Sequence, residues 1–178
     1  ERATIYRRRG HLDMSVRTLR LCQDRHAPLL AQTRWQDGKC WHGLGDLFEQ
    51  QALIHDGAPV GANYARQAGE AYQCALEAYE ADNQDKTKVD RLAIFTDLAM
   101  LDIRSGAIDE AHRKLDLVQA QEPLPTTVAA RLSNRRAWAF VKEGEVHRAQ
   151  RFVKEAAQMA SDANDPLLMS MAEVLRYE

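Results

Sequence analysis

The sequence predicts an all-α protein, a right-handed superhelical stack of antiparallel helical hairpins with about eight helices. Three observations lead to this prediction: a composition that favours helix, a spacing of small residues that recurs three times, and turn signals between segments of helical length. Ala, Leu, Arg, Glu and Gln are abundant, whereas Val, Ile and Thr are few. Straight-chain residues lose little freedom in a helix, while the β-branched residues that favour strands are scarce.

The recurring spacing is the strongest pattern in the chain. Ala99 is followed by Gly106, Ala111, Leu115 and Val118, at intervals of seven, five, four and three residues. The same intervals recur in two further sets: Ala137, Gly144, Ala149, Val153 and Ala156, and Ala3, Gly10, Ser15, Leu19 and Cys22. We expect each glycine to end the first helix of a hairpin in the left-handed conformation. The last three positions of each set then bury one face of the second helix.

The middle of the chain carries a recognisable signature, Trp41-x-x-Leu44-Gly45-x-x-Phe48, followed by Ala68 and Tyr72. It resembles the tetratricopeptide repeat pattern W-x2-L-G-x2-Y…A-x3-F…P. Two later segments resemble it through Leu98, Ala99, Ala111, Leu115 and Pro123, and through Ala137, Phe140, Ala149 and Val153. The last segment departs from the pattern, since Arg136 replaces the usual leucine and no proline closes it. The resemblance implies the superhelical hairpin stack and identifies no biological role.

One hairpin is longer than the others. Gly45 and Ala68 are separated by 23 residues, where the corresponding positions elsewhere are separated by 12. The extra length is about three helical turns, so we expect this hairpin to protrude beyond its neighbours, with its turn at 55–61. The predicted helices are about 11–25, 28–54, 61–82, 86–104, 108–121, 126–143, 146–162 and 166–177. They form one array over 1–178: a partial repeat 1–27, a long-helix repeat 28–84, repeats 86–124 and 126–163, and a capping or partial helix 166–178.

Charge and composition exclude several classes of protein. The net charge is −2 and the one basic run is Arg7-Arg8-Arg9, so nucleic-acid binding is not expected. No apolar stretch approaches the length of a membrane span, and no membrane partner is expected. Three cysteines without metal-type spacing fit free thiols in the cytoplasm. The chain starts without methionine and inside a repeat, so we expect a fragment whose cut, apolar edges allow a homodimer.

The resemblance implies that a partner binds the concave face formed by the first helix of each hairpin. Projecting the repeat onto those helices predicts a groove of His42, Asp46, Glu49, Thr96, Met100, Arg104, Arg131, Asn134, Arg135, Trp138 and Lys142. In this interpretation Trp138 anchors a peptide side chain. In the alternative interpretation Trp138 packs on a neighbouring helix and the charged residues are a solvated face.

More specific sites are not expected. Some tetratricopeptide proteins clamp acidic chaperone tails with Lys, Asn and Arg, but Asp46 and Asp97 stand where such a clamp needs Lys or Asn. His55 and Asp56 are not expected to bind a metal, because no further ligands converge on them. Cys22 and His26 lie four residues apart, but Cys22 occupies a core position of the repeat, so a metal site is not expected there either. No catalytic residue, metal or cofactor is therefore predicted.

The sequence accordingly favours a protein–protein interaction scaffold over an enzyme. Its groove is expected to bind a peptide or helix of a partner protein. The alternative is a regulatory sensor or self-association segment of a larger signalling protein, such as a transcription regulator, nucleotide cyclase or ATPase.

Overall fold

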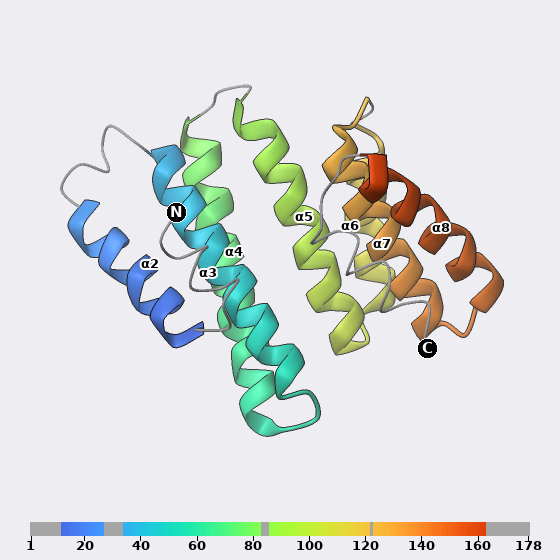
Figure 1. The fold of residues 1–178 in the computed structure, drawn as a ribbon, viewed down its shortest axis with the longest axis horizontal. Helices are drawn as coiled ribbons and strands as arrows, with labels where there is room; N and C mark the ends of the chain where they lie inside the picture. Colours follow the sequence, from blue (N-terminus) through green and yellow to red (C-terminus); the bar gives the residue numbers. More distant parts are fainter. Residues whose placement is uncertain (1–11, 27–33, 83–85, 122, 163–178) are drawn as a thin grey trace. The chain divides into compact units, whose positions relative to one another are not determined.

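The protein is helical wherever its structure is described. The computed structural model describes residues 12–26, 34–82, 86–121 and 123–162, and these ranges hold seven helices and no strand (Figure 1). The helices are α2 (Leu12–His26), α3 (Arg34–Ile54), α4 (Pro59–Asp82), α5 (Lys86–Ser105), α6 (Ile108–Gln119), α7 (Thr126–Lys142) and α8 (Val146–Asp162). The predicted all-α class is confirmed. The predicted helix 166–177 and the segment 28–33 lie outside the described residues.

The chain divides into two compact units, 1–88 and 89–178. Unit 1 contains α2, α3 and α4, and unit 2 contains α6, α7, α8 and nearly all of α5. Each unit is described by itself, and the single array over 1–178 stays a prediction. Over the described segments, none of the helices combines the length and apolarity that crossing a bilayer requires.

Glycines and tyrosines determine how α3 and α4 pack in unit 1. A Cβ atom added to Gly38 would lie closer than 3.0 Å to the Tyr79 ring, and one added to Gly45 equally close to the Tyr72 ring. Both tyrosines are fully buried. Seven residues separate the two glycines and seven separate the two tyrosines, so both contacts fall on one stripe of each helix. Gly45 thus allows close packing from within a helix.

The turn between α3 and α4 is shorter than predicted. Helix α4 starts at Pro59 and not at Gly61 as predicted. Proline fixes φ at a helical value, and its missing N–H is not needed in the first turn of a helix. Gly57, with φ +76°, reverses the chain. Helix α3 has 21 residues and α4 has 24, whereas α2 has 15. Figure 1 shows this turn reaching past the N-terminal end of α2, as expected of the longer hairpin.

In unit 2, two glycines end helices in the same way. Gly106 (φ +85°) follows α5 and Gly144 (φ +79°) follows α7. The N–H of each glycine donates to the carbonyl three residues back, and the next N–H donates to the carbonyl five residues back, at 2.8–3.2 Å. These two hydrogen bonds satisfy carbonyl groups at the end of the helix that have no partner within it. They form only when the glycine adopts the left-handed conformation. The predicted role of both glycines is confirmed.

The residues after these glycines form the core of unit 2. Ala111, Leu115 and Val118 of α6 are fully buried in one cluster with Ala99 and residues of α7. The equivalent residues of α8 are also buried: Ala149, Val153 and Ala156. The buried face is thus confirmed for two of the three registrations. In the third, Ser15 is buried and Leu19 is half-buried, whereas Ala3, Gly10 and the side chain of Cys22 lie outside the described residues.

Alanine substitutions at two neighbouring glycines test the close packing of α3 against α4. Gly45→Ala places a methyl group in the Tyr72 ring, and overpacking of this kind costs about 1–3 kcal/mol. Gly43→Ala is the matched control, since its Cβ meets Leu19 at an ordinary 3.5 Å. The control should gain about 0.5–1 kcal/mol from helix propensity. Urea unfolding followed by circular dichroism gives the unfolding free energy of both variants. Equal changes in the two variants would contradict the close packing of Gly45 on Tyr72.

Candidate functional site

Three of the predicted groove residues gather around Tyr72 in unit 1. The Tyr72 hydroxyl lies 2.8 Å from Glu49 Oε2 and 3.2 Å from Asp46 Oδ1. His42 Nε2 lies 3.7 Å from the same Asp46 oxygen, and the His42 ring meets the Tyr72 ring edge-on at 5.9 Å. A phenol has one proton, so the shorter distance identifies Glu49 as the main acceptor. Glu49 is 7% exposed, and its carboxylate therefore joins α3 to α4.

Two further predicted residues hold a buried carboxylate in unit 2. Arg131 Nη1 lies 3.1 Å from Asp97 Oδ2, and Arg135 Nη2 lies 3.2 Å from Asp97 Oδ1. The side chain of Asp97 is 2% exposed and that of Arg135 is 5% exposed. Both guanidinium groups donate to Asp97, so its buried carboxylate is paired within unit 2. The expectation that the chain does not clamp a chaperone tail stays a prediction.

The remaining predicted groove residues range from buried to exposed: Thr96, Met100, Asn134, Arg104, Trp138 and Lys142. Met100 is buried in the core of unit 2, and Trp138 is half-buried against both core clusters of that unit. Thr96 Oγ1 donates to the carbonyl of Ala93 in its own helix at 2.6 Å. Met100 and Trp138 therefore pack within unit 2, whereas Lys142 is exposed. A continuous groove over both units stays a prediction.

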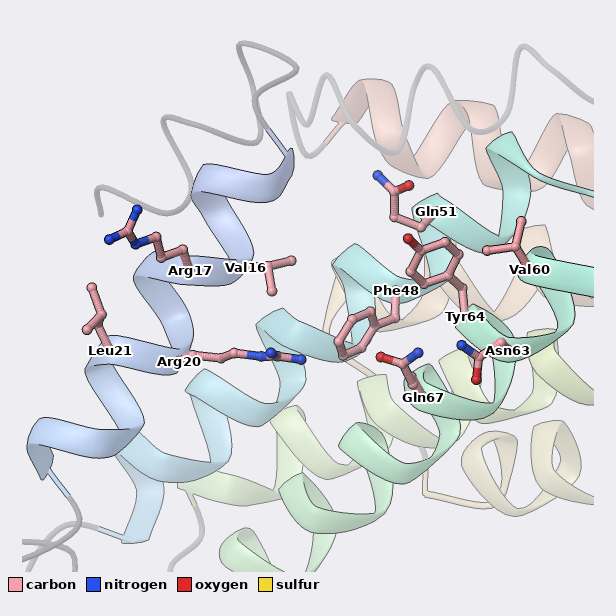
Figure 2. A pocket seen from close by; sticks show the side chains of 10 residues that line it. All are labelled: Val16, Arg17, Arg20, Leu21, Phe48, Gln51, Val60, Asn63, Tyr64 and Gln67. Atoms are coloured by element: carbon pink, nitrogen blue, oxygen red, sulfur yellow. The ribbon is translucent and has the colours of Figure 1, made fainter.

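The structure shows a groove that the sequence did not indicate. It lies in unit 1 between α2 and the hairpin of α3 and α4, with a volume of about 640 Å³ (Figure 2). We call it the α2–hairpin groove. Its lining comes from all three helices. Val16, Arg17, Arg20 and Leu21 belong to α2, Phe48 and Gln51 to α3, and Val60, Asn63, Tyr64 and Gln67 to α4. Figure 2 shows Val16 and Arg20 pointing from α2 toward the hairpin, with Arg17 and Leu21 on the outer side of α2.

Stacked rings form the floor of the α2–hairpin groove. The rings of Phe48 and Tyr64 stack at 6.3 Å with 21° between their planes. His55 stacks on Tyr64 at 5.9 Å and 24°. Tyr64 is thus packed by rings from the end of α3 and from the turn, and little rotamer freedom remains to be lost when a ligand binds. His55, considered above as a metal ligand, has a packing role here.

The helices of the hairpin, with 21 and 24 residues, are longer than the 15 residues described for α2. Apolar side chains near the hairpin turn lack cover among the described residues: Leu53 and Val60 are exposed, and Ile54 is 65% exposed. The sequence carried a signal for this, namely the extra length between Gly45 and Ala68. Length alone did not reveal which side chains would face α2.

A second groove of about 600 Å³ lies in unit 2. It is lined by residues from the end of α6, the connection to α7, α7 and α8: Gln119, Pro123, Leu124, Ala129, Leu132, Ser133, Phe152, Glu155 and Met159. This lining contains one carboxylate and no cation. The two grooves therefore differ in charge.

The surroundings of Cys74 oppose its ionisation. Cys40 and Cys74 are free, half-buried thiols, as expected. Burial raises the pKa of Cys74, and the nearby carboxylates of Glu77, Asp37 and Glu70 raise it further. A raised pKa lowers the thiolate fraction at neutral pH, which opposes nucleophilic chemistry at this thiol.

Comparison with known proteins finds no matching protein-family model, no matching curated protein and no matching solved structure.

Neutralising Asp97 tests the buried ion cluster. Asp97→Asn leaves two guanidinium groups without their carboxylate and should cost about 3 kcal/mol of unfolding free energy. Asp116→Asn is the matched control, because Asp116 bonds Arg136 at 2.7 Å but is 68% exposed. This exposed pair should contribute no more than about 1 kcal/mol. Urea unfolding of both variants checks the difference, and similar losses would refute the structural role of Asp97.

The pH dependence of Cys74 reactivity tests its electrostatic surroundings. In a variant with Cys22→Ser and Cys40→Ser, the thiol should react with an aromatic disulfide reagent more slowly than glutathione does at pH 8. Since the pKa is raised, the rate should still be climbing above the pH at which an ordinary thiol is half ionised. Stopped-flow absorbance gives the rate, and a plateau below pH 8 would contradict the assignment.

Proposed function

We propose that this protein is a protein–protein interaction scaffold, a tetratricopeptide-type array of hairpins that holds a peptide or helix of a partner protein. The α2–hairpin groove is the observation that carries the proposal. It combines an apolar floor with a polar rim on a surface open to solvent. Peptide-binding surfaces share this combination, because a peptide brings both apolar side chains and backbone polar groups.

The side chains of the groove match the two parts of a peptide. Tyr64 is half-buried and offers ring surface to an apolar anchor, and the buried Phe48 ring stacks against it. Contacts of this kind contribute most to interface affinity. The carboxamides of Gln51, Asn63 and Gln67 can each donate and accept hydrogen bonds. They can therefore satisfy peptide N–H and C=O groups that leave water.

Repetition in unit 2 supports the array. Gly106 and Gly144 end their helices with the same pair of hydrogen bonds and precede the same buried face. Hairpins of this kind bury their faces by stacking on one another, and stacking leaves surfaces on which partners bind.

Site-directed photocrosslinking tests the proposed function. A benzophenone amino acid at Gln67, inside the groove, should give a discrete adduct with another protein in cells that express this chain. The same amino acid at Gln73, exposed on α4 outside the groove, should not. Mass spectrometry of the adducts identifies the partner.

Two results would reject this function. Identical adduct patterns from both positions would show that the groove has no part in binding. An adduct at twice the mass of the chain, containing one sequence, would show self-association and favour the alternative role in a larger signalling protein.

A further inference from the structure

The lining of the α2–hairpin groove is positively charged, although the protein as a whole is not. The chain has 26 acidic and 24 basic residues and a net charge of −2. The groove lining nevertheless contains two arginines, Arg17 and Arg20, and no carboxylate. The groove of unit 2 has the opposite composition, with Glu155 as its charged residue. The positive lining is therefore a local feature of unit 1.

These two arginines also differ from most others in their contacts. Among the side chains that the structure describes, those of Arg17 and Arg20 have no hydrogen bond or ion pair. Other arginines bond carboxylates: Arg66 with Glu70, Arg113 with Glu110, Arg131 and Arg135 with Asp97, Arg136 with Asp116, and Arg151 with Glu155. The guanidinium of Arg20 thus keeps its donors for a ligand, and Figure 2 shows it directed toward the hairpin.

The aromatic floor lies across the groove from this charge. Val16 of α2 points toward the same space, and Val60 adds a further apolar wall. A bulky apolar side chain placed on Phe48 and Tyr64 would leave its neighbouring residues within reach of α2. A carboxylate on such a neighbour can form a bidentate bond with Arg20.

We propose that the α2–hairpin groove binds an acidic peptide segment of the partner protein. A bulky apolar side chain of that segment packs on Tyr64, beside the largely buried Phe48, and an adjacent carboxylate bonds Arg20. This inference rests on the proposed scaffold function and specifies its partner. None of the residues predicted for the concave groove lines this surface, so the binding surface is a different one.

A displayed peptide library that contains both signs of charge tests the proposal. Its peptides are about a dozen residues long, with two positions drawn from Leu, Phe, Trp and Met and the others from Asp, Glu, Lys, Arg, Ser and Ala. Selection on the whole chain should enrich peptides with Asp or Glu beside the apolar position. Fluorescence anisotropy of an enriched peptide should show affinity falling as NaCl rises from about 0.05 to 0.5 M.

Charge reversals locate the contact. Arg20→Glu should weaken binding of the acidic peptide by about tenfold or more, because attraction becomes repulsion next to the aromatic floor. Arg17→Glu should have a smaller effect, since Arg17 lies on the outer side of α2. Arg113→Glu is the matched control, with the same charge change at a residue 71% exposed in unit 2, and should leave affinity unchanged. Circular dichroism checks that each variant is folded.

The outcomes separate this inference from the function on which it rests. Enriched peptides that crosslink at Gln67 but carry basic or neutral flanks would overturn the acidic partner and leave the scaffold function standing. Equal loss of affinity in Arg20→Glu and Arg113→Glu would also overturn it, because binding would follow net charge and not the groove. If no peptide is enriched and Gln67 gives no adduct, both proposals fail.

Discussion

The close approach of α3 and α4 is the constraint on which unit 1 depends. Gly38 and Gly45 remove the side chains that would hold the helices apart, and Tyr79 and Tyr72 fill the space above them. A glycine inside a helix is unfavourable by about 1 kcal/mol relative to alanine, so burial of two tyrosines must offset that loss. The same approach brings the Tyr72 hydroxyl to Glu49, whose buried carboxylate needs a donor.

In unit 2, alanines and glycines, and not glycine–tyrosine contacts, allow the helices to pack closely. Small alanines lie at the contacts, and glycines in the left-handed conformation allow each chain reversal to take few residues. A buried ion cluster then joins α5 to α7 through Asp97. Buried ion pairs add little stability over an apolar contact but penalise any arrangement that leaves one charge alone. Asp97 therefore specifies the register of α7 on α5 more than it strengthens the unit.

Local features of the fold were predictable, whereas the site depended on contacts between distant residues. The ends of α5 and α7 follow from Gly106 and Gly144, because a helix terminus is decided by its own residues. The pairing of Asp97 with Arg135 spans 38 residues and is invisible to any local pattern. For the same reason Met100, assigned to a groove from its position in the repeat, is a core residue. The start of α4 differs from the predicted one because Pro59 begins the helix and does not belong to the turn.

The α2–hairpin groove is lined by side chains of three helices and is not marked by any sequence motif. Tyr64 is half-buried and lines the groove, whereas Phe48, which stacks against it, is only 8% exposed. The apolar floor and the arginines on α2 have different physical roles. Rim charges act over about a Debye length, which is ~8 Å at physiological salt, and mainly accelerate encounter. Desolvation of an anchor on the rings mainly slows dissociation. A ligand lacking carboxylates should therefore bind slowly, and one lacking the apolar anchor should leave quickly, so only a segment with both features gains from both parts of the groove.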